Sequence, residues 1–145
     1  MIKTFRGLMA DGAHETILLH TNDGSIGYRI VKFEIMTAEP YGGSAAEHIM
    51  KIYKIPQTGA TNPDVDFSDQ TLLATAITNN STSGYQYATV PSVIFDREIF
   101  NQDIYLTHWD NQGAQKCNYY IELEQVNLDL NENTVATLKD IRNLS

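Results

Sequence analysis

A chain of 145 residues with a formal net charge of −8 has the length of one domain and enough residues for a self-sufficient core. Its ten basic residues are dispersed singly, whereas binding a phosphate backbone requires clustered Lys and Arg, so we expect no direct nucleic-acid binding. A single cysteine excludes an intrachain disulfide and argues against a thiolate zinc cluster. Because the sequence shows neither a signal peptide nor a membrane-spanning apolar run, we expect a soluble protein without an export signal.

Short clusters of Gly, Asn, Asp and Pro interrupt the chain at fairly regular intervals, which is typical of a β-sandwich or barrel. Turns are predicted at residues 11–12 and 21–24, where Gly accepts positive φ angles and Asn and Asp tolerate them. The apolar residues of segment 28–37 move from even to odd positions, so either both faces of that strand are covered or a β-bulge adds a residue. The strands predicted in the first half are 2–9, 15–20, 28–37 and 47–55.

Segment 45–55 has apolar spacing that fits a helix as well as a strand. We favour a strand at 47–55, because the segment is short, contains β-forming residues and stops at Pro56. Polar loops are predicted at 57–70 and 80–86. The strands predicted around the second loop and after it are 71–79, 90–95 and 104–109.

Residues 117–130 alternate apolar and polar side chains for longer than any other run. Side chains of a strand point to opposite faces in turn, so this segment predicts a long strand with one dry and one wet face. The apolar set shifts from odd to even positions near Glu124 and Gln125, which predicts a β-bulge there. The fold expected for residues 1–130 is all-β, a single antiparallel β-sandwich of jelly-roll-like form.

The tail, residues 131–145, changes to a different periodicity. Asn131 or Asn133 is suited to cap a short helix, and apolar residues then recur every three positions. A helix of about 12 residues is marginal by itself, so we expect this helix or arm to pack on the sheet or on a neighbouring subunit. The apolar stripe comprises Val135, Leu138, Ile141 and Leu144.

Acidic residues form two groups with a chemical and a simpler interpretation. Glu122 and Glu124 share the wet face of the long strand, about 7 Å apart, which is within the range of a glycosidase carboxylate pair but is also ordinary for a half-buried sheet. The three acidic residues of the long loop do not fit an EF-hand, whose sixth position is Gly and whose twelfth is Glu. Capping of their own turns is the favoured interpretation. These loop residues are Asp64, Asp66 and Asp69.

No catalytic residue, cofactor or metal site is predicted. The four histidines lack a ligand spacing such as His-x-x-x-His, and no Gly-x-Ser-x-Gly motif is present. Cys117 begins a predicted strand and has no histidine or carboxylate base beside it in the sequence, so we expect a small buried hydrophobe rather than a nucleophile. The histidines are His14, His20, His48 and His108.

Aromatic residues supply the remaining candidates for binding. Tyr85 and Tyr87 lie in a polar loop, where exposed aromatic rings anchor protein interfaces or, together with Trp109, stack on sugars. We interpret both tyrosines as interface residues. For at least half of the aromatic residues on predicted strands we expect core packing; these are Tyr105, Trp109, Tyr119 and Tyr120.

Four segments carry a family resemblance that spans nearly the whole chain. They are His20-Thr21-Asn22-Asp23-Gly24-Ser25-Ile26-Gly27-Tyr28-Arg29-Ile30-Val31-Lys32-Phe33, Val65-Asp66-Phe67-Ser68-Asp69-Gln70-Thr71-Leu72-Leu73, Ile94-Phe95-Asp96-Arg97-Glu98-Ile99-Phe100-Asn101-Gln102-Asp103-Ile104-Tyr105, and residues 118–143. Together they resemble small structural proteins of tailed bacteriophages, especially from aquatic hosts. The resemblance implies a virion component and brings no catalytic motif with it.

The resemblance does not say which component this is. Because a lattice-binding protein must be soluble, compact and able to contact its neighbours, and residues 1–9 and 131–145 could make such contacts, we favour a non-enzymatic capsid decoration or cement protein that is made in the host cytoplasm and resides in the virion. Its expected partner is the major capsid protein, and a homo-oligomer such as a trimer would fit a local threefold position of a capsid. Three alternatives stay open: a tail, baseplate or head–tail adaptor component, a carbohydrate-binding module, and a small hydrolase that uses Glu122 or Glu124.

Overall fold

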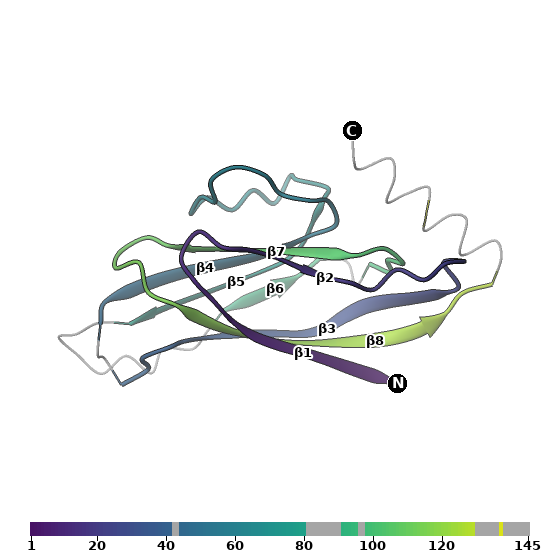
Figure 1. The fold of residues 1–145 in the computed structure, drawn as a ribbon, viewed down its shortest axis with the longest axis horizontal. Helices are drawn as coiled ribbons and strands as arrows, with labels where there is room; N and C mark the ends of the chain where they lie inside the picture. The colour runs from purple at the N-terminus through teal and green to yellow at the C-terminus, as the bar shows by residue number, and fades with distance from the viewer. Residues whose placement is uncertain (42–43, 81–90, 96–97, 130–136, 138–145) are drawn as a thin grey trace.

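The computed structural model describes residues 1–41, 44–80, 91–95, 98–129 and Thr137. These residues form two antiparallel sheets packed as a β-sandwich, which confirms the predicted fold class (Figure 1). The strands are β1 (Ile2–Met9), β2 (His14–Ile17), β3 (Ile26–Thr37), β4 (Ala46–Tyr53), β5 (Leu72–Asn80), β6 (Ser92–Ile94), β7 (Ile104–Asp110) and β8 (Cys117–Asn127).

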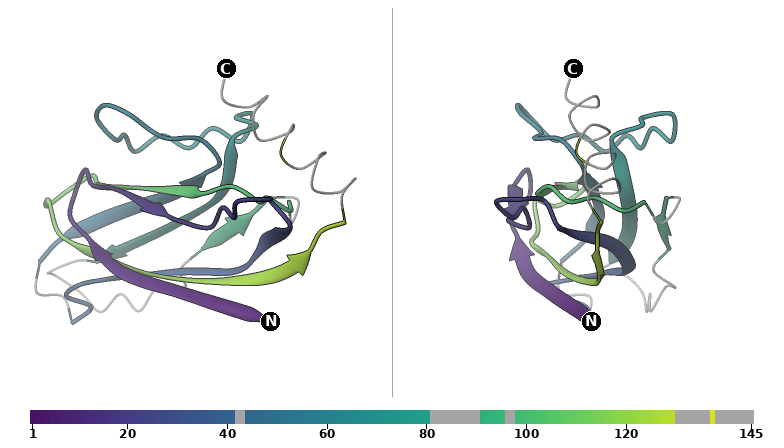
Figure 2. Two further views of the ribbon diagram at one scale, coloured as in Figure 1. Left: turned by 45° about the vertical axis from the view of Figure 1, so that its right-hand side comes forward. Right: turned by 90° about the vertical axis from the view of Figure 1, so that its right-hand side faces the viewer.

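The smaller sheet has the strand order β1-β8-β3 and the larger one the order β2-β7-β4-β5-β6. The two layers lie one above the other along the molecule, as the views of Figure 2 show. The long strand β8 is the centre of the small sheet, where its odd-numbered residues from Cys117 to Leu123 are buried and the even-numbered ones are more exposed. This is the dry and wet face that the alternation predicted.

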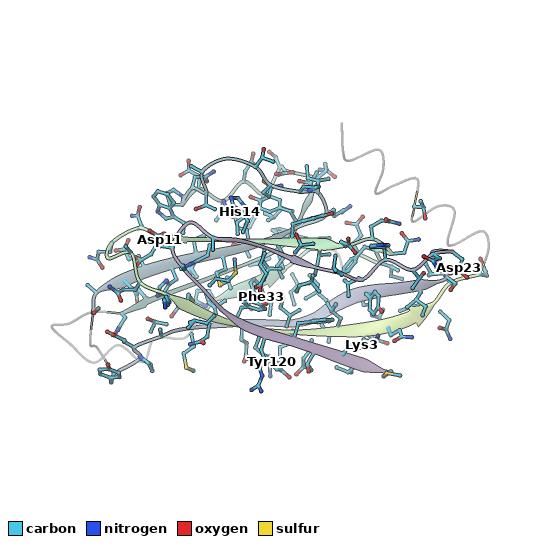
Figure 3. All side chains as sticks on the ribbon, viewed as in Figure 1. Lys3, Asp11, His14, Asp23, Phe33 and Tyr120 are labelled. Atoms are coloured by element: carbon cyan, nitrogen blue, oxygen red, sulfur yellow. The ribbon has the colours of Figure 1, made fainter. Side chains whose placement is uncertain are left out.

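The two sheets close over one core to which both contribute. Phe33 of the small sheet and Met50 of the large sheet are at most 1% exposed, and Figure 3 places Phe33 between the layers and Tyr120 on the outer side of the small sheet. Near one end the layers are joined through the backbone, because Tyr28 and Phe100 exchange hydrogen bonds of 2.8 and 2.9 Å. One main-chain bridge therefore links β3 to the segment that precedes β7.

The irregularity in the small sheet lies in β3 and not in β8. Val31 is the extra residue, because Ile30 pairs with Leu123 and Lys32 with Glu122; this confirms one of the two alternatives for segment 28–37. The bulge predicted near Glu124 and Gln125 is wrong, since β8 pairs without interruption through that stretch.

The apolar residues of β8 shift from odd to even positions because, near the end of the strand, other residues cover its outer face. Gln125 keeps the inward register opposite buried Tyr28. On the other side, Ile99 and Leu128 approach Gly27 so closely that a Cβ there would lie 2.9 to 3.2 Å from their methyl groups. Apolar residues therefore occupy the outer face of β8 where that face is covered, and the strand continues without a bulge.

Most other boundaries agree with the sequence. Segment 45–55, whose spacing also fitted a helix, forms the strand β4. Gly12 and Gly24 in the predicted turns have positive φ angles of 78° and 66°. The predicted loop, residues 57–70, contains no strand. Strand β2 begins earlier and ends sooner than predicted, and β6 is shorter. The tail prediction falls outside the described residues except at Thr137, whose backbone is helical and whose hydroxyl accepts a hydrogen bond of 2.8 Å from Asn101.

Candidate functional site

The predicted interface residues cannot be placed by this structure. Tyr85 and Tyr87 in the loop, and the apolar stripe of the tail, lie outside the described residues. Trp109, the third aromatic residue of the sugar-binding hypothesis, pairs with Ile49 on the outer face of the large sheet and donates its indole N–H to Asn111 at 3.1 Å. The stripe residues concerned are Val135, Leu138, Ile141 and Leu144.

Glu122 and Glu124 do lie on the outer face of the small sheet, but each already has a partner. The hydroxyl of Tyr120 donates a hydrogen bond of 2.7 Å to Glu122. Arg29 pairs with Glu124 through two contacts of 2.8 and 2.7 Å. The hydrogen bond to Glu122 raises the pKa of Tyr120. The two carboxylates therefore serve the sheet surface, which is the simpler of the two interpretations.

Two of the three acidic loop residues, Asp66 and Asp69, follow the simpler interpretation. One carboxylate oxygen of Asp66 accepts hydrogen bonds from the backbone and hydroxyl of Ser68, at 2.9 and 2.6 Å. Asp69 does the same for Thr71, at 2.8 and 2.6 Å. The hydrogen bonds from Ser68 lower the pKa of Asp66. These side chains cap turns of a loop that folds onto the outer face of the large sheet.

A buried lysine attaches this loop to the sheet. Lys51 on β4 is 3% exposed and donates to the side chain of Asn62 at 3.2 Å and to the carbonyl of Asp64 at 2.6 Å. Burial lowers the pKa of Lys51, while Asp64 and Asp69 oppose that shift. Lys54, also buried, pairs with Glu98. Lys51 thus joins the loop to β4, and Lys54 joins the end of β4 to the segment that precedes β7.

A groove lies beside this loop on the outer face of the large sheet. It has a volume of about 470 Å³, and its walls come from the loop, from β5 and from β6. Several of its apolar side chains are exposed, with Phe67 at 61%, Ile77 at 44% and Val93 at 40%. Phe67 is held by an edge-to-face contact with Phe95, with ring centroids 4.8 Å apart. The groove is thus lined mainly by apolar side chains, together with Asp66, whose carboxylate is engaged by Ser68.

A second feature is a cluster of polar side chains inside the sandwich. His48 on β4 and His108 on β7 face inward from the large sheet, and Cys117 at the start of β8 faces them from the small sheet. All three are 0% exposed. One ring nitrogen of each histidine and the sulfur of Cys117 lie within 4.8 Å of one another. Three metal-ligating groups thus meet where an ordinary core would have only apolar contacts.

Hydrogen bonds fix the orientation of this cluster. Nδ1 of His108 lies 2.9 Å from the carbonyl oxygen of Ala10, so this nitrogen carries the proton. Nε2 of His108 is then an acceptor for Nδ1 of His48, at 2.8 Å. This assignment leaves Nε2 of His48 unprotonated, and that buried atom has no hydrogen-bond partner. The hydrogen-bonded chain from Ala10 through His108 therefore ends at His48 Nε2, which has no hydrogen-bond donor.

Burial shifts the pKa of two members of the cluster, His48 and Cys117. It lowers the pKa of His48 to about 4, with a further lowering from His108 that Asp110 and Asp11 partly offset. It also raises the pKa of the Cys117 thiol to about 12. Both groups are therefore neutral at pH 7, and the thiol makes only long contacts of 3.6 and 3.5 Å to the carbonyl oxygens of Met36 and Asn118.

Sequence reasoning did not find this cluster. Cys117 is buried, as predicted, but His48, His108 and Cys117 come from three strands, and only the pairing of β4 with β7 and the stacking of the two sheets bring them together. One signal was present: His48 and His108 each occupy a position of the same parity as inward apolar neighbours, Met50 and Leu106. A histidine at an inward position of a strand is a candidate for a buried polar site.

No protein-family model matches this chain, and neither a curated protein nor a solved structure shows significant similarity to it. Within the part of the chain that the structure describes, no helix is long and apolar enough to cross a bilayer.

Proposed function

We propose that the protein is a non-enzymatic structural component of a tailed-phage virion, and within the virion a decoration protein that binds the major capsid lattice. The observation that carries the proposal is the exposed apolar groove on the outer face of the large sheet, formed around Phe67, Ile77 and Val93. Large apolar patches at a protein surface mark sites of contact with other proteins. The four segments that resemble phage structural proteins supply the class of partner.

The remaining surface of the sandwich supports a contact role. Acidic groups that would suit hydrolysis are engaged elsewhere: Asp66 in a turn, Glu122 with Tyr120 of its own strand, and Glu124 in a cross-strand pair with Arg29. A protein that coats a capsid lattice needs a stable domain and a surface that binds the lattice, and it needs no cleft that excludes water. In this proposal the β-sandwich is the stable domain and the groove is the binding surface.

The location and copy number of the protein in intact particles test the proposal. We expect quantitative mass spectrometry of purified virions to give copies in proportion to the major capsid protein, and labelled particles to show the protein on the head. A dozen or fewer copies at the tail would replace decoration by a baseplate or adaptor role. Absence from purified particles would overturn the virion assignment itself.

A charge placed in the groove should separate binding from folding. We expect Phe67→Glu to abolish capsid binding, because a carboxylate in an apolar contact must lose its hydration without gaining a partner. The free energy of unfolding should change by about 1 kcal/mol or less, since Phe67 is mostly exposed. Co-sedimentation with capsids that lack the protein measures the first effect, and urea unfolding measures the second.

Met36→Glu is the matched control. Met36 is 59% exposed on the outer face of the opposite sheet, so the substitution adds the same charge at an equally exposed apolar position. It should leave capsid binding intact. Equal losses from both variants would mean that net charge, and not the groove, governs attachment.

A further inference from the structure

The cluster of His48, His108 and Cys117 contains an unexplained polar atom. Buried nitrogen and oxygen atoms in proteins have hydrogen-bond partners in the large majority of cases, and an exception calls for a water, an ion or a functional reason. Nε2 of His48 is such an exception, at a residue that is 0% exposed. The same ring belongs to a cluster with a second imidazole and a thiol, which are both metal-binding groups.

We propose that His48, His108 and Cys117 form a buried site for one soft or borderline metal ion, Zn²⁺ or Cu⁺. Imidazole and thiolate are the ligands that select these ions over Ca²⁺ and Mg²⁺, which prefer oxygen. The inference is independent of the proposed function, because it concerns the interior of the sandwich and not its binding face.

The dimensions of the cluster are close to those of a metal centre. With zinc–nitrogen bonds of about 2.0 Å and a zinc–sulfur bond of about 2.3 Å, tetrahedral geometry separates the ligand atoms by about 3.5 Å. The three candidate atoms already lie within 4.8 Å of one another. Closing by about 1 Å, which side-chain rotation within the cluster can supply, converts this arrangement into a coordination shell.

Outer contacts hold two of the ligands in place. The proton on Nδ1 of His108 is donated to the carbonyl of Ala10 at 2.9 Å, so Nε2 of that ring is the nitrogen directed at the cluster. Such a contact from the second nitrogen is the usual support of a metal-binding histidine. Cys117 is fixed by its place in β8, where it pairs with Met9 on one side and Thr37 on the other.

Coordination balances without a redox step. Each imidazole binds as a neutral ring through Nε2 and keeps its proton on Nδ1. At His108 Nε2 the metal–nitrogen bond replaces the hydrogen bond from Nδ1 of His48. The S–H bond of Cys117 is replaced by a metal–sulfur bond, and its proton is released to solvent. One proton therefore leaves per ion bound, and the new bonds cross from the large sheet to the small one. Metal binding should thus stabilise the sandwich as a whole.

The test uses the full chain, stripped with a chelator and then loaded with Zn²⁺, with Cu⁺ under anaerobic reducing conditions, or with Ca²⁺ as a hard-ion control. After gel filtration we expect about one zinc or copper ion per chain by elemental mass spectrometry, no retained calcium, and a raised Tm. Competition between the two ions ranks their affinities for the site. Retention of neither zinc nor copper would overturn the proposal.

Cys117→Ala is the decisive variant, because it removes the sulfur and leaves a small apolar side chain in the core. We expect it to weaken binding by more than the about 10–100-fold that loss of an outer contact costs. The exposed His20, whose ring pairs with Asp103 at 2.7 Å, gives the control His20→Ala, which should bind as the wild type does. Unchanged binding by Cys117→Ala would assign the metal to the surface and overturn the site.

Cobalt provides a readout that does not depend on the variant folding. Co²⁺ bound at this site in the wild-type chain should show thiolate-to-cobalt charge-transfer absorption, which zinc should then abolish by displacing it. Cobalt bound without that absorption would exclude Cys117 as a ligand and so would overturn the proposed ligand set.

Discussion

Leu123→Asp is expected to prevent stable folding. Leu123 is 0% exposed on β8, the central strand of the small sheet, between Lys3 of β1 and Ile30 of β3. An ionised carboxylate there loses its hydration and gains no buried partner, and the leucine contacts are lost as well. We expect a loss of about 4 kcal/mol or more, which is a large part of the 5–15 kcal/mol typical of a domain. Urea unfolding and the yield of soluble protein measure it.

Lys3 is the cation nearest in register to this position. Its ammonium extends to the hydroxyl of Tyr28 at 3.4 Å, and Lys3 itself is an exposed residue at the rim. If the Lys3 ammonium stabilises the introduced carboxylate, adding Lys3→Met to Leu123→Asp will destabilise the protein further. Lys3→Met alone gives the baseline for that comparison.

Glu122→Ala is the neighbouring control for the same strand. Glu122 points to the outer face, where it accepts the hydrogen bond from Tyr120. We expect a change within about 0.5 kcal/mol, as is usual for surface positions. If Glu122→Ala lowers the urea midpoint more than Leu123→Asp does, the two faces of β8 have been assigned the wrong way round.

Asp110→Ala should be the second severe substitution. The Asp110 carboxylate, at the end of β7, accepts backbone N–H groups of Glu47 at 2.9 Å, Gln112 at 3.0 Å and Gln115 at 2.6 Å. Asp110 is 5% exposed, so its removal leaves three backbone donors with little access to water. At about 1 kcal/mol or more for each donor, we expect a total loss of about 3 kcal/mol in denaturant unfolding. A loss below 1 kcal/mol would show that water replaces the carboxylate.

The same carboxylate predicts acid sensitivity. Burial alone would raise the pKa of Asp110, but the hydrogen bonds from the backbone of Gln115, Glu47, Gln112 and Gly113 outweigh burial and lower it. A depressed carboxylate pKa means that the unfolded chain takes up the proton first. The stabilisation is therefore complete above the ordinary value of 3.8 and is lost as the pH falls below it through the folded-state pKa.

Asp110→Asn tests this assignment. Asparagine keeps one oxygen acceptor but places an N–H₂ group where a carboxylate oxygen accepts from Gln115 or from the other two donors, so it should be less stable than the wild type at neutral pH. Its stability should depend less on pH below 3.8, because one depressed carboxylate is gone. Parallel acid titration curves for the two proteins would remove Asp110 from the account of acid unfolding.

The candidate sites differ in how far the sequence could reach them. The turns at Asp66 and Asp69 were predictable because each carboxylate bonds to a residue two positions away. The groove was not, because Phe67 comes from a loop and Val93 from a strand whose adjacency depends on the pairing of β5 with β6. The interface tyrosines, Tyr85 and Tyr87, remain a prediction.

The sequence by itself determined the class of fold and the faces of its strands, because alternation and turn chemistry are relations between residues close together in the chain. Cys117 could be recognised from it as buried, and Leu123 as part of the core. Only the tertiary structure decided that the phase change of β8 reflects a change of cover, and that His48 and His108 meet Cys117 between the sheets. These outcomes depend on strand order, register and sheet stacking, which join residues tens of positions apart, and no local pattern records them.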